Sequence, residues 1–146
     1  MKMNISIILF ISLLSLSFIQ SSQKVEIEIE NIDCKRGGTI LMAIFSESNK
    51  NDFPSNDKGI YQYKKLQIQN KPLLKIKLNL PPGKYAIALL HDENGNNEMD
   101  YNWVHYPQEG FGFSKNPKII LSEPDFDECA FSIPTQSLIK IKMVYK

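Results

Sequence analysis

Residues 91 to 100, His-Asp-Glu-Asn-Gly-Asn-Asn-Glu-Met-Asp, carry oxygen-bearing side chains at alternating positions. Ca²⁺ prefers six to eight oxygen ligands in a flexible cage, and alternate side chains of a tightly curled loop can converge on one point. The spacing therefore predicts a Ca²⁺ site in this loop, with the backbone carbonyl near Glu98 as one further ligand. The predicted metal-binding residues are Asp92, Asn94, Asn96, Glu98 and Asp100.

The loop departs from a standard calcium-binding loop at two positions. Asn97 stands where a glycine usually makes the sharp turn, and Trp103 stands where a glutamate usually supplies two oxygens. A complete site would need a carboxylate from elsewhere, water, or a low affinity. The alternative is a plain acidic turn, because the dipeptide Asn94-Gly95 is a strong hairpin signal that needs no metal.

Aromatic residues follow the acidic loop at high density. Six aromatic-ring residues fall within thirteen positions: Tyr101, Trp103, His105, Tyr106, Phe111 and Phe113. Aromatic side chains on a loop can stack on a sugar or anchor a protein partner. We assign Trp103, Tyr106 and Phe111 as ligand-binding candidates for an envelope or extracellular protein or polysaccharide. The alternative is a flap that covers the open end of the fold.

The two histidines, His91 and His105, flank the acidic loop and define an alternative site with Glu109. His91 could act as a general base oriented by Glu109, as in a small hydrolase. The same residues could also hold a transition metal, with Glu109 or Asp100 as a third ligand. No Gly-x-Ser-x-Gly elbow is present, so we assign no catalytic residue and favour a non-enzymatic role.

The elements that must position these residues are predicted to be strands. Residues Val25 to Glu30 alternate apolar and acidic side chains, which is typical of a half-buried strand. Further strand-like segments are expected at 39–45, 61–68, 73–80, 85–90, 118–121, 129–133 and 138–145. No segment predicts a helix of ten residues. Seven to eight short strands separated by turn signals predict an all-β, antiparallel two-sheet sandwich.

The first 22 residues have the features of a signal peptide. Lys2 precedes an apolar run at 5–19, which ends in a polar segment and is short for a membrane span. We therefore expect residues 23–146 to form one secreted or periplasmic domain without a membrane span. In such a compartment Cys34 and Cys129 could form a disulfide, and the alternative is two buried free thiols.

The charge balance argues against nucleic-acid binding. The chain has 146 residues, with 17 basic and 16 acidic side chains, and Lys2 is the only basic residue before position 23. The expected domain is therefore neutral and has no basic stripe for a phosphate backbone.

Three sequence blocks resemble one bacterial family in their order and spacing. These blocks are Leu80 to Ile87, His91 to Asn96 and Pro107 to Ser114. They are similar to the DUF2141 family of exported proteins, and the resemblance spans about Val25 to Tyr145. It implies a small exported β-sandwich of transthyretin-like or immunoglobulin-like type, without an assigned activity. Asn97 and residues 103–106 depart from the family pattern.

Overall fold

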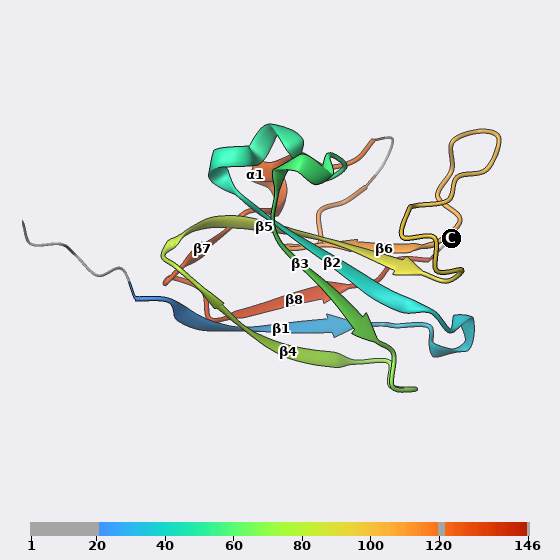
Figure 1. Cartoon of the computed structure of the whole chain (residues 1–146), viewed down its shortest axis with the longest axis horizontal. Coiled ribbons are helices and arrows are strands. Elements are labelled where there is room, and N and C mark those ends of the chain that lie inside the picture. Colours follow the sequence, from blue (N-terminus) through green and yellow to red (C-terminus); the bar gives the residue numbers. More distant parts are fainter. Residues whose placement is uncertain (1–20, 120–121, 146) are drawn as a thin grey trace, which may run out of the picture.

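The computed structural model describes residues 21–119 and 122–145, which form two β-sheets packed face to face (Figure 1). The predicted leader lies outside the described residues except for Ser21 and Ser22, and the first strand begins directly afterwards at Gln23. The prediction of an all-β two-sheet sandwich of seven to eight strands is confirmed, with eight strands among the described residues.

The smaller sheet has three strands in the order β4-β1-β8, with bounds Leu74–Leu80, Gln23–Glu30 and Leu138–Lys142. The larger sheet has five strands. Its path is β3-β2-β5-β6, and β7 pairs with the start of β5. The bounds are Ile60–Gln67 for β3, Thr39–Ser46 for β2, Gly83–Asp92 for β5, Gly110–Phe113 for β6 and Phe131–Ile133 for β7.

One strand pair differs from the expected antiparallel arrangement. β1 pairs with β4 in antiparallel register, but it pairs with β8 in parallel register. The chain leaves β7 in the larger sheet, crosses to the smaller sheet and enters beside β1 in the same direction. The expected strand at 118–121 is also absent over residues 118 and 119, while residues 120 and 121 lie outside the described part of the chain.

Alternating side chains build the core between the sheets. Val25, Ile27 and Ile29 of β1 have no exposed surface and pack in one cluster with apolar residues of β2 and β5. The intervening glutamates point to the outer face of the smaller sheet. There Glu28 pairs with Lys75 of β4 and Lys140 of β8, and hydrogen bonds from both lysines lower the pKa of Glu28.

A second apolar cluster lies on the outer face of the larger sheet. Three short 3₁₀ helices and one α-helical turn interrupt the strands: η1 (Cys34–Arg36), η2 (Glu47–Asp52), η3 (Asp57–Gly59) and α1 (Phe126–Cys129). Phe53 follows η2 and packs edge-on against Phe45 and Phe126, at centroid distances of 5.3 and 6.0 Å. These contacts cover one half of the outer face of the larger sheet and leave the half near Asp92 open.

The predicted disulfide between Cys34 and Cys129 is wrong, because both thiols are free. Cys34 begins η1 and packs against the core between the sheets, whereas Cys129 is buried in the second cluster on the outer face. The larger sheet therefore separates the two side chains. Burial raises the pKa of the Cys129 thiol to about 12, which keeps it protonated at physiological pH.

We therefore expect iodoacetamide to label Cys34 but not Cys129 in the native protein at mildly alkaline pH. The half-buried Cys34 can reach solvent, while Cys129 is both inaccessible and held as the neutral thiol. Mass spectrometry should then find two labelled cysteines after denaturation without a reductant. If neither cysteine is labelled under those denaturing conditions, Cys34 and Cys129 form a disulfide in the protein.

Candidate functional site

The acidic loop leaves the larger sheet at Asp92, the last residue of β5. The Asp92 side chain has no exposed surface, and its two carboxylate oxygens accept hydrogen bonds from Gly95 N–H at 2.7 Å and Asn97 N–H at 3.2 Å. Lys65 Nζ lies 3.9 Å from the same carboxylate. The buried charge of Asp92 thus fixes the curl of the loop. Asn97 adopts the left-handed φ of 63° that its place in the turn requires.

Three of the predicted ligand side chains meet above this buried carboxylate. The amide groups of Asn94 and Asn96 donate to the two oxygens of Asp100, at 2.5 and 3.1 Å. The amide oxygens of the same residues accept backbone N–H groups further along the loop. Glu98 is exposed and lines the neighbouring groove, and its side chain makes no hydrogen bond to this cluster. The spacing of the sequence therefore predicted correctly which side chains lie close together, but not how they interact.

The loop offers few negatively charged ligands for a cation. In the described part of the chain no group of three or more His, Cys, Asp or Glu side chains surrounds one point. Amide and carbonyl oxygens would therefore have to complete any cation site beside Asp92 and Asp100. Such a set suits a hard cation such as Ca²⁺ and does not suit a transition metal.

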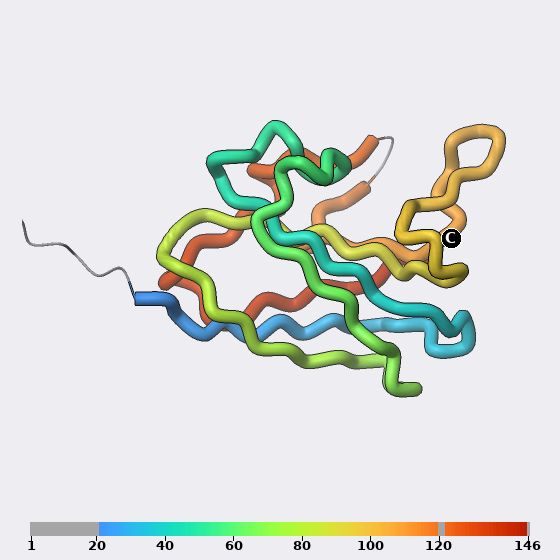
Figure 2. The backbone as a smooth tube through the Cα atoms, in the orientation of Figure 1, coloured from blue at the N-terminus to red at the C-terminus, as the bar shows by residue number. Residues whose placement is uncertain are grey.

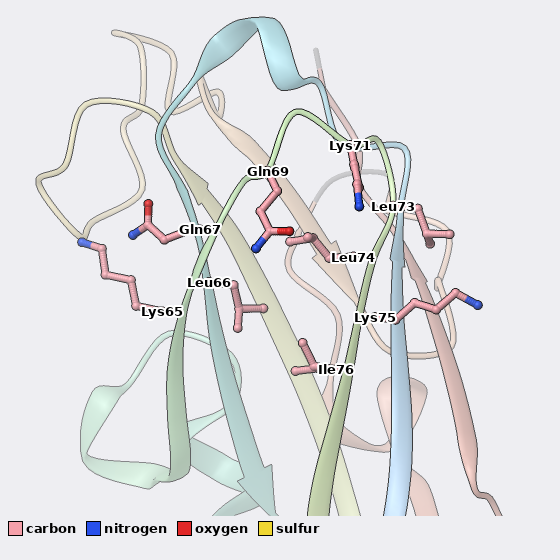
Figure 3. A pocket seen from close by; sticks show the side chains of 9 residues that line it. All are labelled: Lys65, Leu66, Gln67, Gln69, Lys71, Leu73, Leu74, Lys75 and Ile76. Carbon is pink, nitrogen blue, oxygen red and sulfur yellow. The ribbon is translucent and has the colours of Figure 1, made fainter.

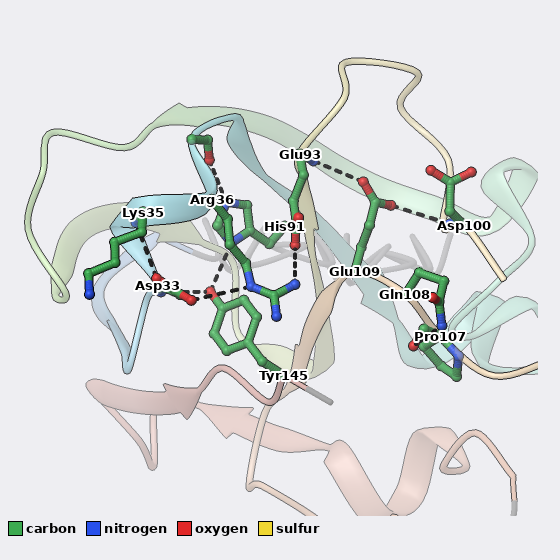
Figure 4. A network of polar contacts seen from close by, with 11 residues as sticks. Asp33, Lys35, Arg36, His91, Glu93, Asp100, Pro107, Gln108, Glu109 and Tyr145 are labelled. Carbon is green, nitrogen blue, oxygen red and sulfur yellow. Dashed lines mark hydrogen bonds and ion pairs between the residues drawn. The ribbon is translucent and has the colours of Figure 1, made fainter. Parts of the chain in front are cut away.

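Glu109 lies beside the loop and holds both of its ends (Figure 4). Glu109 is buried, with 5% of the residue exposed, and its two carboxylate oxygens accept hydrogen bonds from Glu93 N–H at 2.9 Å and Asp100 N–H at 3.3 Å. The segment before β6 thus supplies the carboxylate that closes the acidic loop. The sequence analysis assigned Glu109 a different role, because nothing in the neighbouring sequence indicates which backbone groups it contacts.

His91 is not paired with Glu109, so this part of the alternative site is wrong. The imidazole is fully buried, and its ring nitrogens contact Gly37 O at 2.6 Å and Tyr145 Oη at 2.8 Å. Because a carbonyl oxygen only accepts, Nε2–H donates to Gly37, and in the neutral imidazole Nδ1 then accepts the Tyr145 hydroxyl proton. Both nitrogens are engaged within the fold, and His91 has no open side toward a substrate.

His105 lies in the loop between Tyr101 and Pro107, here called the aromatic loop, which projects from the molecule (Figure 1, upper right). Tyr101 and Pro107 form a β-bridge at its base, and the Asn102 side chain accepts the N–H groups of residues 104 and 106 at 3.0 and 2.9 Å. Trp103 is 92% exposed at the tip. The expectation that this segment covers the end of the sandwich is therefore wrong. The structure also keeps His105 away from the buried His91.

Phe111 belongs to a different surface from Trp103 and Tyr106. It lies on the open half of the outer face of the larger sheet, where a groove of about 450 Å³ runs beside the acidic loop. The apolar residues that line the groove include Leu41, Ala43, Ala88, Phe111 and Phe113. Its lining also includes the tyrosines and carboxylates Tyr63, Tyr101, Asp57, Glu98 and Glu123. Burial and the nearby carboxylates raise the pKa of Tyr63 and of Tyr101. The groove is therefore an apolar surface with an acidic rim.

A family model described as an uncharacterized protein conserved in bacteria, DUF2141, matches residues 27–141. The chain belongs to the DUF2141 family. Comparison with curated proteins and with solved structures gave no significant match. The match includes residues from all eight strands of this DUF2141 protein and the whole acidic loop. Within its described residues, no helix reaches the length and apolar character that a membrane crossing requires.

A polar network at the base of the acidic loop was not predicted from the sequence (Figure 4). Arg36 Nη1 contacts Glu93 Oε1 at 2.8 Å, and Arg36 Nε contacts Asp33 Oδ2 at 3.3 Å. The hydrogen bond with Glu93 raises the pKa of Arg36. The Tyr145 ring lies under the guanidinium at 4.9 Å, and its hydroxyl accepts Asp33 N–H. Figure 2 shows that the segment after β1, the acidic loop and the C-terminal segment gather at one end of the molecule.

Proposed function

We propose that this DUF2141 protein is an exported, non-enzymatic module in which Ca²⁺ orders the loop from Asp92 to Asp100. The ordered loop presents the neighbouring aromatic surface to an envelope or extracellular protein or polysaccharide. The leader expected at residues 1–22 accounts for export. An enzymatic role for His91 and Glu109 is not proposed, because each side chain is engaged by other groups of the fold.

The observation that carries the proposal is the convergence of Asn94 and Asn96 on Asp100. Each amide oxygen accepts one backbone N–H and keeps a second lone pair, so that it can also face a cation. Asp92 and Asp100 would supply the negative charge. A cation bound there would offset the repulsion between these two carboxylates and hold the loop in one conformation.

The aromatic residues support the second half of the proposal. Trp103 is held at the tip of a loop whose backbone is fixed by Asn102, so little conformational entropy is lost when a partner covers it. Tyr106 is 43% exposed on the same loop, and Phe111 lines the adjacent groove. The aromatic loop follows Asp100 directly, so that ordering of the acidic loop also orders its base.

We expect millimolar Ca²⁺ to raise the melting temperature of the protein expressed without residues 1–22, relative to the same protein in chelator. A ligand that binds only the folded state at a hundred times its Kd adds about 2.7 kcal/mol to the free energy of unfolding. Differential scanning calorimetry measures this shift. The variant Asp100→Asn removes one carboxylate from the cluster and should lose most of it.

The matched control is Glu98→Gln, which removes the same charge from the same loop. The Glu98 side chain is exposed and only its backbone carbonyl is a candidate ligand, so the Ca²⁺ shift should be retained. Equal shifts in both variants would mean that the effect is general screening of acidic charge. A wild-type protein that melts at the same temperature in Ca²⁺ and in chelator would rule out the cation site.

A further inference from the structure

A cavity of about 520 Å³ opens between the edges of the two sheets (Figure 3). β3 is the edge strand of the larger sheet and β4 is the edge strand of the smaller sheet, and residues 68–73 connect them. Neither strand pairs with the other, so the two edges lie apart along this side of the sandwich. The cavity is therefore a side opening into the space between the sheets.

Aliphatic side chains from both edge strands point into this cavity. Leu66 comes from β3, and Leu74 and Ile76 come from β4; Figure 3 shows all three directed into the space between the strands. They pack against the main core cluster but are only half-buried. Covering such surface removes apolar area from water, which favours binding of an apolar chain. An alkyl chain placed here would continue the apolar core of the sandwich to its edge.

The charge around the cavity is positive. Its charged lining residues are Lys65, Lys71 and Lys75, and no carboxylate is among the described residues that line it. Lys65 points away and donates to Asn97 at 3.0 Å, and Lys75 points away and pairs with Glu28. Lys71 instead lies over the mouth between the strands. In the described part of the chain it has no hydrogen-bond or ion-pair partner. The mouth thus holds one uncompensated cation above an apolar interior.

We propose that this cavity binds a free alkyl carboxylate, a single-chain fatty acid, with its chain between the sheets and its carboxylate at Lys71. Charge complementarity selects the anion, and the aliphatic lining selects a flexible chain. Gln69 lies beside Lys71 at the mouth and can donate a further hydrogen bond from its amide. The volume is that of a site for one small ligand. This site is separate from the acidic loop and goes beyond the proposed function.

Isothermal titration of decanoate into the protein without residues 1–22 tests the proposal. We expect saturable binding to the wild type and, since a hydrogen bond to a charged group contributes about 1.5 kcal/mol or more, a loss of affinity of about tenfold in Lys71→Ala. Lys77→Ala is the matched control, because Lys77 is an exposed lysine of β4 that does not line the cavity. It should bind decanoate as the wild type does.

Two further arms separate this site from other surfaces. Ile76→Trp fills the cavity and should abolish binding, with a thermal melt to confirm that the variant folds. If Ile76→Trp does not fold, Leu74→Phe is used to fill the cavity instead. Decyltrimethylammonium has the same chain with the opposite charge and should bind at least about tenfold more weakly. Equal affinity for both probes, equal affinity in Lys71→Ala and the wild type, or binding only to phosphatidylglycerol vesicles and not to decanoate would overturn the proposal.

Discussion

Glu109→Gln should lower the free energy of unfolding by roughly 2 to 4 kcal/mol, because it removes one acceptor of a partly buried backbone N–H and the negative charge that strengthens the other hydrogen bond. In the wild type each carboxylate oxygen accepts one backbone N–H, from Glu93 and from Asp100. Glutamine offers one oxygen and one NH₂ group in the same place. The NH₂ group would face a backbone donor, and one end of the acidic loop would lose its acceptor. Urea denaturation measures the change in stability.

The same substitution should also reduce the stabilisation by Ca²⁺. Glu109 fixes the separation between the two ends of the loop. Without its carboxylate, part of the free energy of cation binding is needed to order the loop, and the affinity for Ca²⁺ falls. Glu98→Gln is the control for charge, since it should leave the urea midpoint within experimental error. An unchanged midpoint for Glu109→Gln would show that water replaces the carboxylate at both backbone N–H groups and that the loop needs no support from β6.

The fold was predictable from the sequence because side chains in a strand alternate between two faces. Val25, Ile27 and Ile29 repeat with period two, and this pattern identifies β1 and its buried face whatever its neighbours are. The same pattern carries no information on which strands pair. The parallel pairing of β1 with β8 joins two segments about a hundred residues apart, and periodicity cannot indicate it.

The candidate site was also predictable only where its contacts are local in the sequence. Asn94, Asn96 and Asp100 lie within seven residues, so their spacing predicted that they meet. Glu109 and His91 take partners that depend on the packing of distant segments. Tyr145 Oη contacts His91 across 54 positions in the sequence, and the sequence shows Tyr145 only as the last apolar residue of an alternating segment. The chemistry assigned to His91 was therefore wrong, although its position at a strand end was right.

The position of Tyr145 depends on a glycine that directly follows Glu109. A Cβ atom at Gly110 would lie 2.2 Å from Tyr145 Cε1, which is far closer than two carbon atoms can approach. The backbone of Gly110 is not in the left-handed region, and the three atoms nearest to the added Cβ all belong to the Tyr145 ring. The absence of a side chain at Gly110 thus leaves room for the Tyr145 ring, whose hydroxyl contacts His91 and Asp33.

Gly110→Ala should lower the free energy of unfolding by roughly 2 to 4 kcal/mol, because the ring must move and leave two partners unsatisfied. Asp33 N–H and His91 Nδ1 both lose the Tyr145 hydroxyl when the ring shifts. The cation–π contact between Arg36 and the ring is lost with them. Chemical denaturation of the single variant measures the total effect.

A double-mutant cycle with Tyr145→Ala isolates the cause. Tyr145→Ala already breaks the network and removes the ring that a Cβ at position 110 would meet, so adding Gly110→Ala to it should cost only about 1 kcal/mol or less, because the effects of residues in contact are not additive. The difference between the two backgrounds is the coupling between the missing side chain at Gly110 and the Tyr145 ring. If Gly110→Ala is equally costly in both backgrounds, the limit is set by the close approach of β6 to its neighbours, and the Tyr145 network does not depend on this glycine.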